Sequence, residues 1–229
     1  MKWSCQQLLF LFAVVIFAAH GEIDKKWMKD ALQSHFSQPR HHATYPKYKM
    51  RAMRFIRDEF REYGLETHLD TFNTRLQTVS GINVIGVLKG KHFNTDDDVI
   101  VGVAAHYDTM RDTSGVDDNG AAVVAMLQAA KKVASEPPRN NTVIFAAFDL
   151  EEWEDAGFRG YMQNCYHKRC DTMERVTDSM IEFAAKTSRA LAATVNQMAP
   201  TLPNVNSGHQ TFPEVVILFW VVFLAMLPM

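Results

Sequence analysis

The stretch that decides the fold is residues 99–120, VIVGVAAHYDTMRDTSGVDDNG, in which an apolar run gives way to acidic residues. Its first part, Val99 to Ala105, is continuously apolar, as expected for a strand that is covered on both faces. Residues 121–133 are rich in Ala, Val, Met and Leu and predict a helix, and residues 143–148 predict a second apolar strand. A strand, a helix and a strand in this order indicate a right-handed βαβ unit, so we expect an α/β fold with a mostly parallel central sheet.

Periodic segments extend this unit on both sides. Residues 47–63 predict an amphipathic helix, because apolar side chains recur there at three- and four-residue intervals until Gly64 ends the pattern. The other expected elements are a helix at 23–36, strands at 65–72 and 82–88, a short strand around Val176 and a helix at 180–198. A chain of 229 residues is long enough for one such domain with a buried core.

Composition narrows the class of protein. Hydrophobic residues make up 47% of the chain and charged residues 22%, the proportions of an ordered globular protein. The formal net charge is −2, and no predicted element carries a strongly basic face. The sequence therefore gives no electrostatic reason to expect nucleic acid as a partner.

The N-terminus has the pattern of a secretory signal peptide. Lys2 precedes an apolar run, Leu8 to Ala19, that is too short and too close to the start to span a membrane. Ala19-His20-Gly21 places small residues at the −3 and −1 positions of a cleavage before Glu22. We therefore predict that residues 1–21 are a signal peptide and that the mature protein is secreted; a buried N-terminal helix is the alternative.

Two sequence features agree with an oxidising compartment. Cys5 leaves with the signal peptide, so Cys165 and Cys170 remain as a pair that predicts one local disulfide, with two free thiols as the alternative. Asn140-Asn141-Thr142 is an N-x-[ST] acceptor in a polar loop, and we expect a glycan on Asn140.

The C-terminal segment, residues 206–229, forms a hydrophobic tail. Val215 to Met229 is nearly all apolar, but at fifteen residues it is short for a membrane span, which needs about 20. Small residues lie just upstream, as in a lipid-anchor signal. Association with a membrane through this tail is one interpretation, and a tail of unrelated origin that replaces the natural end of the domain is the other.

Residues suited to metal chemistry follow the two apolar strands or open the helix between them. His106 directly follows the first strand, Asp118 opens the helix, and Glu152 directly follows the second strand. In an open parallel sheet, side chains just past the carboxyl ends of strands converge on one edge, so these three can meet. One imidazole with carboxylates and no thiolate suits zinc or a similar divalent ion.

Two neighbouring acids add the groups that hydrolysis needs. Of two successive glutamates, Glu152 can bind the metal while Glu151 takes the proton of the attacking water. Asp108 can accept the other ring N–H of His106 and fix its tautomer. Taken alone, a histidine after a strand is more often a loop residue, an acidic pair before a helix is more often a cap, and two glutamates after a strand are more often solvated. The placement of all three at strand ends or at the opening of the linking helix is what indicates a metal site.

The three blocks with their spacing resemble the M28 family of zinc aminopeptidases. They are residues 103–109 (VAAHYDT), 115–120 (GVDDNG) and 148–152 (FDLEE), and the lead-in 83–90 is also similar to the family. The resemblance covers roughly residues 45 to 180. It implies a three-layer sandwich of the zinc-exopeptidase type, with a domain at residues 22–205.

The same resemblance implies roles for individual residues. His106 would bind one zinc, Asp118 would bridge two, Glu152 would bind the second zinc, and Glu151 would be the general base. The family's further aspartate matches Asp178 best, as the second ligand of the His106 zinc. The family's last ligand is a downstream histidine that has no match here, so we expect the C-terminal part of the domain to be incomplete. Up to two zinc ions are expected, and one of the two sites would lack a ligand.

Three functions follow from these predictions. The first is a secreted zinc-dependent exopeptidase that hydrolyses peptide bonds near the N-terminus of a peptide substrate by metal-activated water. The second is a glutaminyl-cyclase-like aminoacyltransferase, which resembles the same fold and works with one zinc. The third is a catalytically impaired, peptidase-like binding module, which the absent histidine favours.

Overall fold

The computed structural model describes residues 23–74, 79–152 and 169–202. The predicted signal peptide and the predicted hydrophobic tail lie outside these residues, so both stay predictions. The described elements, in chain order, are helix α2 (Lys25–Ala31), π-helix η1 (Leu32–Phe36), helix α3 (Pro46–Glu62), strands β1 (Glu66–Asn73), β2 (Ser80–Leu88) and β3 (Val101–His106), π-helix η2 (Val116–Ala121), helix α4 (Ala122–Ala134), strand β4 (Val143–Phe148), 3-10 helix η3 (Met173–Arg175) and helix α5 (Asp178–Met198).

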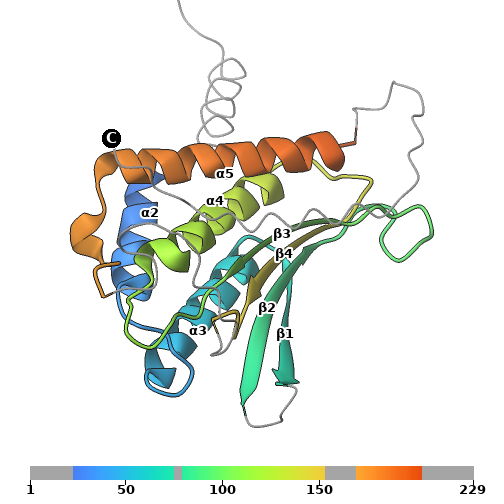
Figure 1. The fold of residues 1–229 in the computed structure, drawn as a ribbon. Coiled ribbons are helices and arrows are strands. Elements are labelled where there is room, and N and C mark those ends of the chain that lie inside the picture. Colours follow the sequence, from blue (N-terminus) through green and yellow to red (C-terminus); the bar gives the residue numbers. More distant parts are fainter. Residues whose placement is uncertain (1–22, 75–78, 153–168, 203–229) are drawn as a thin grey trace, which may run out of the picture.

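The described strands form a mixed sheet in the order β1-β2-β4-β3 (Figure 1). β3 pairs with β4 in parallel, and α4 connects them, so the predicted βαβ unit is confirmed. The prediction of a mostly parallel sheet is wrong, because β2 runs antiparallel to both β1 and β4. Apolar periodicity identifies a strand but carries no information about its direction, and β1 and β2 are close enough in sequence to pair as a hairpin.

One face of the sheet packs against the helices. Phe145 of β4 lies opposite Gly86 of β2 and Val103 of β3, and its ring lies 6.3 Å from that of Phe60 on α3. Figure 1 shows α3 and α4 on this side of the sheet and α5 along α4. The second helical layer of the expected sandwich is not seen among the described residues.

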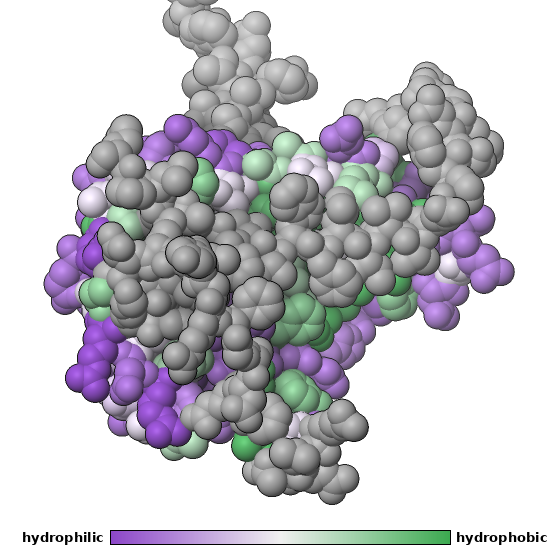
Figure 2. Space-filling view, in the orientation of Figure 1, coloured by the Kyte–Doolittle hydropathy of each residue, from purple (hydrophilic) through white to green (hydrophobic). Residues whose placement is uncertain are grey.

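The opposite face of the sheet is only half-buried in the described residues. Ile85, Val87 and Ile144 point to this side and are partly exposed. Figure 2 shows hydrophilic residues over the helices at the left and hydrophobic areas over the sheet. The fully buried apolar side chains lie on the other face, between the sheet and the helices, where burying each large one contributes about 1.5–3 kcal/mol.

The helices follow from local signals in the sequence. α3 begins with Pro46 in its first turn, buries Met53, Ile56 and Phe60, and ends before Gly64, whose φ of +80° is in the left-handed region. α4 is buried along almost its whole length between the sheet and α5. No helix in the described ranges is both long enough and apolar enough to cross a membrane.

The region after residue 169 differs from the prediction. The expected short strand around Val176 is wrong, because η3 ends at Arg175 and Val176 lies between η3 and α5. The Thr177 side chain accepts a hydrogen bond from the Met180 amide, so it caps α5. The run Val176-Thr177-Asp178 is therefore the entrance to a helix.

Candidate metal centre

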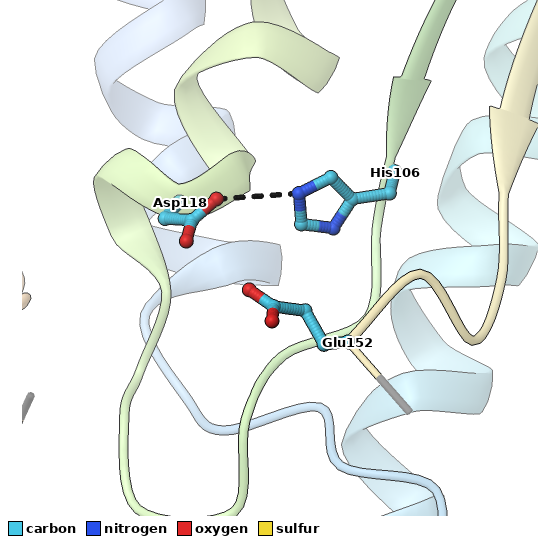
Figure 3. A group of neighbouring side chains, drawn as sticks. All are labelled: His106, Asp118 and Glu152. Atoms are coloured by element: carbon cyan, nitrogen blue, oxygen red, sulfur yellow. Dashed lines mark hydrogen bonds and ion pairs between the residues drawn. The ribbon is translucent and has the colours of Figure 1, made fainter. Parts of the chain in front are cut away.

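The structure brings His106, Asp118 and Glu152 together at the carboxyl end of the parallel strand pair (Figure 3). His106 is the last residue of β3, Asp118 lies in η2, and Glu152 lies in the turn after β4. Each offers one ligand atom, and these atoms all lie within 4.8 Å of one another. The three residues are only 4%, 8% and 7% exposed, respectively. Three of the four predicted ligands therefore form one buried group.

His106 is held between two carboxylates. Its Nε2 lies 3.2 Å from Oδ1 of Asp118, and its Nδ1 lies 3.4 Å from Oδ1 of Asp108. Burial alone would lower the pKa of His106, but the carboxylates of Asp108 and Asp118 beside it raise that pKa to about 10. The imidazole therefore sits in a strongly negative environment, which also attracts a cation.

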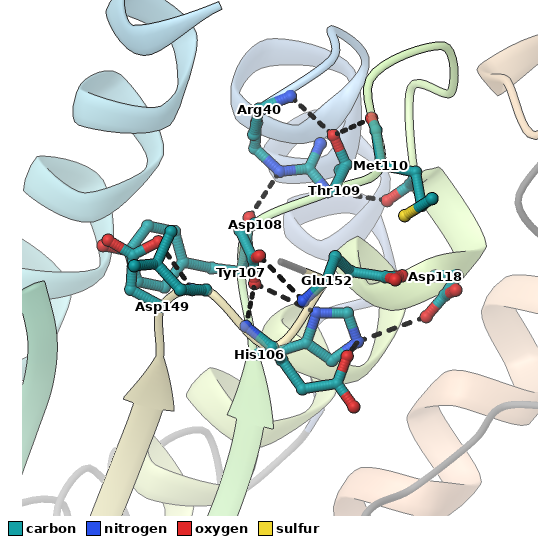
Figure 4. Close-up of polar contacts among 12 residues, drawn as sticks. Arg40, His106, Tyr107, Asp108, Thr109, Met110, Asp118, Asp149 and Glu152 are labelled. Atoms are coloured by element: carbon teal, nitrogen blue, oxygen red, sulfur yellow. Dashed lines mark hydrogen bonds and ion pairs between the residues drawn. The ribbon is translucent and has the colours of Figure 1, made fainter. Parts of the chain in front are cut away.

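Asp108 does more than the sequence predicted. Besides facing His106, its carboxylate accepts hydrogen bonds from the backbone amides of Glu151 and Glu152, at 3.2 and 3.0 Å. This buried side chain thus links the end of β3 to the turn after β4 (Figure 4). One carboxylate therefore faces the histidine and also holds the backbone of both glutamates.

Glu151 and Glu152 are adjacent but have different environments. The side chain of Glu151 is 49% exposed, and its Oε2 lies 3.8 Å from Nε2 of His106. Glu152 is buried within the ligand group. An accessible carboxylate beside a buried ligand group is the arrangement that a general base needs, because it can reach both water and substrate.

The segment of Asp118 is supported by a residue that the sequence analysis missed. Asp171 is buried, and its two carboxylate oxygens accept hydrogen bonds from the amides of Asp117 and Asp118, at 2.8 and 3.1 Å. Burial together with the charges of Asp171 and Asp118 raises the pKa of Asp117 to about 7. Asp171 stands alone in the sequence more than fifty residues downstream, and no pattern there indicates this contact.

A buried ion pair supports the turn that carries the glutamates. Nζ of Lys49, on α3, lies 2.6 Å from Oδ2 of Asp149, and both side chains are almost fully buried. Asp149 also accepts hydrogen bonds from the amides of Ile82 and Leu150, at 3.0 and 2.9 Å. Neither role is predictable from the sequence, because the pairing of Lys49 with Asp149 depends on how α3 packs on the sheet.

Arg40 is a second residue that the sequence analysis missed. It is fully buried, and its guanidinium donates hydrogen bonds to the backbone carbonyls of Tyr107, Ser114 and Gly115, among others. Burial lowers the pKa of Arg40 to about 10, against the opposing charges of Asp171, Asp108 and Asp118. The side chain therefore stays positively charged at neutral pH.

The structure does not bring Asp178 to this centre. The side chain of Asp178 is 96% exposed in the first turn of α5, where Oδ1 lies 3.2 Å from Nζ of Lys29. The ligand group found among the described residues does not include it. The structure therefore does not place Asp178 with the other three predicted ligands, because its segment begins a helix and does not end a strand.

Two further predictions concern residues away from the centre. Cys165 lies outside the described residues, so the Cys165–Cys170 disulfide stays a prediction. Asn140 is partly exposed in the loop between α4 and β4, where its backbone carbonyl accepts a hydrogen bond from His92. Its glycosylation also stays a prediction.

Comparisons with known proteins agree with this geometry. Residues 83–162, which contain His106, Asp118 and Glu152, match peptidase family M28. The chain is 34% identical over 92 residues to aminopeptidase YwaD of Bacillus subtilis; this match covers 40% of the chain but only 20% of the relative. The chain thus spans about a fifth of the length of this curated relative.

Solved structures show a similar fold at low identity. The aminopeptidase from Aneurinibacillus sp. strain AM-1 has a TM-score of 0.64 and 11% identity, over 83% of this chain and 97% of that one. Glutaminyl cyclase from Porphyromonas gingivalis has a TM-score of 0.50 and 17% identity, over 59% of this chain and 49% of that one. At these identities the two structures establish the likeness of the fold alone.

Proposed function

We propose that this chain, whose residues 83–162 match peptidase family M28, is a zinc-dependent exopeptidase that cleaves peptide bonds next to a free N-terminus. The family match and the aminopeptidase relative support a peptidase role. The observation that carries the proposal is the buried group of His106, Asp118 and Glu152 with the exposed Glu151 beside it.

The residues present suit zinc. One imidazole nitrogen and two carboxylate oxygens make a set of three protein ligands, the number that catalytic zinc sites use while they keep one position open. Asp108 faces Nδ1 of His106, which leaves Nε2 directed to the ligand group. Zinc held by this group would supply Lewis-acid activation of water and of the scissile carbonyl.

The protein's own groups would carry the proton transfers. Glu151 would accept a proton from the attacking water through its exposed carboxylate and deliver it to the leaving amine. The Asp108 carboxylate, by holding the Glu151 and Glu152 amides, keeps both glutamates beside His106. The low exposure of His106 and Glu152 keeps bulk water away from the ligand group and strengthens its electrostatic interactions.

Glutaminyl-cyclase-like aminoacyl transfer is the second candidate. It is favoured by the likeness in fold to the glutaminyl cyclase and by a described ligand group of only three residues. The peptidase reading is preferred because the matched family is a peptidase family and the curated relative is an aminopeptidase. A binding module without turnover is the third candidate.

The substitution Glu151→Gln tests the proposal. Because general acid–base groups contribute roughly 10²–10⁴-fold, we expect this variant to lose hydrolysis by about that factor while its zinc content stays at the wild-type level. Glu182→Gln, the same chemical change at an exposed position on α5, should leave both unchanged. Hydrolysis of aminoacyl-coumarins and zinc per chain are measured on the purified full chain.

Each outcome of this assay separates the candidates. Retained turnover in Glu151→Gln would refute the role of Glu151 as the general base. Conversion of an N-terminal glutamine peptide without coumarin release would favour the cyclase reading. Bound zinc without either reaction, or a folded protein without zinc, would leave only the binding module.

Secretion is part of the same proposal. It is supported by the sequence pattern of residues 1–21 alone. N-terminal sequencing of the protein released by a eukaryotic host should begin at Glu22; retention of residues 1–21 would contradict it.

A further inference from the structure

We infer that Arg40 is a positioning residue that sets the separation of His106 and Asp118, and thereby the zinc affinity and ligand geometry of the centre. The inference rests on the proposed function, because it presumes that the group binds zinc. It assigns a role in metal binding to a residue that touches none of the ligand side chains.

The guanidinium of Arg40 binds both ends of the loop that joins the two ligands. Its Nε donates to the carbonyl of Tyr107, at 2.7 Å, next to His106 in the chain. Its Nη1 and Nη2 donate to the carbonyls of Ser114 and Gly115, at 2.8 and 2.7 Å. One rigid planar group therefore ties the end of β3 to the start of η2.

The same side chain fixes this loop to the helices. Nη1 also donates to the carbonyls of Phe36, the last residue of η1, and Gln38, at 2.7 and 3.0 Å. The backbone amide of Arg40 donates to Oγ1 of Thr109, at 2.8 Å, near the start of the loop (Figure 4). The loop therefore cannot shift without breaking hydrogen bonds that are shielded from water.

Gly115 transmits this constraint to Asp118. Its carbonyl accepts hydrogen bonds from Arg40 and also from the amide of Gly120, on the far side of Asp118. The φ of Gly115 is +57°, and a side chain there would collide with the carbonyl of Asp118 and with Thr109. A tight turn held by Arg40 thus leads directly into the residue that presents the carboxylate.

Lysine cannot replace this arginine. Arginine presents five N–H donors in a fixed plane, whereas lysine presents three donors from one nitrogen, too few to reach carbonyls spread over two loop ends and η1. Arg40 also places a buried positive charge close to Asp108, Asp118 and Asp171, which offsets their mutual repulsion before a metal binds. Because lysine would keep this charge, the loss of the fixed donor array alone predicts weaker zinc binding with lysine than with arginine.

The chain offers a matched control in Arg139. It is also buried, and it also donates to a backbone carbonyl, that of Ala199, at 2.6 Å. Arg139 precedes β4, whereas Glu152 follows it, so the two lie at opposite ends of the strand. Arg139→Lys therefore reproduces the chemical change and the cost of a buried arginine without touching the His106–Asp118 loop.

The test compares Arg40→Lys, Arg139→Lys and the wild type in the full chain. Zinc affinity is measured by chelator competition, and the geometry of the ligands by the visible absorption spectrum of the Co²⁺-substituted protein. We expect Arg40→Lys to weaken zinc binding by about 10–100-fold, as for other residues that orient ligands, and to shift the Co²⁺ bands. Arg139→Lys should leave both unchanged even if it lowers thermal stability.

Thr109→Val provides a second variant in case Arg40→Lys does not fold. It keeps the shape of the side chain but removes the oxygen that accepts from the Arg40 amide. We expect zinc affinity to fall by about fivefold, the effect of one hydrogen bond.

The outcomes separate this inference from the proposed function. A wild-type protein that binds no zinc would refute the proposed function and this inference with it. Wild-type zinc binding with unchanged affinity and spectrum in Arg40→Lys would overturn only the inference. Equal losses of zinc affinity in Arg40→Lys and Arg139→Lys would also overturn the inference, because the effect would then be general destabilisation. If Arg40→Lys does not fold, unchanged zinc affinity in Thr109→Val would overturn the inference instead.

Discussion

The carboxyl end of the β3–β4 pair and the first turn of α5 both carry carboxylates that were predicted to bind zinc, but only the first brings its carboxylates together with a histidine. Asp118 and Glu152 are buried with His106, and Asp108, Asp171 and Arg40 hold their backbone in place. Asp178 is exposed and contacts Lys29 across the surface. The difference teaches that candidate ligands lie together where buried groups fix their backbone, a feature that residue type and spacing alone do not reveal.

The start of α5 has its own reason to carry an aspartate. A helix N-terminus has a partial positive charge, so acidic side chains in the first turn are stabilising there. Thr177 caps the same turn. Asp178 is therefore explained by the helix it begins, without any metal.

The largest expected effect concerns the buried support of the glutamate turn. Lys49→Met removes one partner of a buried ion pair and leaves the Asp149 carboxylate uncompensated, which should lower the free energy of unfolding by about 3–5 kcal/mol. Lys25→Met, which breaks the exposed pair with Glu182, should cost far less. Urea unfolding monitored by circular dichroism measures the free energy of unfolding of both variants. Equal decreases in the two variants would show that the buried ion pair stabilises the protein no more than the exposed one.

An intermediate effect is expected from removing a ligand. His106→Ala should weaken zinc binding by more than about 100-fold, because even residues that only orient ligands contribute about 10–100-fold. His68→Ala, on the exposed strand β1, is the matched control and should bind zinc like the wild type. Calorimetric titration with zinc distinguishes the two, and wild-type affinity in His106→Ala would remove the histidine from the site.

The smallest effect is expected at α5. Asp178→Asn should leave zinc affinity and turnover unchanged and the unfolding midpoint close to that of the wild type, because the side chain is exposed and its ion pair with Lys29 is screened by water. The same zinc titration tests this. A marked loss of zinc would reinstate Asp178 as a ligand and contradict the separation of the two regions.

Local signals were sufficient for most of the fold. Period-3.6 spacing located α3 between Pro46 and Gly64, and the apolar run before His106 located β3. Strand direction was not accessible, because β2 looks the same in sequence whether it runs parallel or antiparallel to β4. The expected strand at Val176 failed because a short polar-apolar alternation also occurs at a capped helix start.

The sequence was sufficient to predict that three of the four proposed ligands lie together, but not to predict the residues that support them. His106, Asp118 and Glu152 each stand at the end of a strand or the opening of a helix, a placement that sequence can reveal. Arg40, Lys49 and Asp171 each support the site through a contact between residues that are 54 to 100 positions apart in the chain. Such contacts depend on how the elements pack, and a single sequence does not encode them in any short motif.

The central claim is that His106, Asp118 and Glu152 bind one zinc ion together. Its most direct test is the zinc anomalous difference map from crystals of the full chain grown with Zn²⁺. The account predicts a peak about 2.0–2.2 Å from Nε2 of His106 and from one carboxylate oxygen of each of Asp118 and Glu152. A map at saturating zinc with no peak there, or with the strong peak on other residues, would contradict the claim.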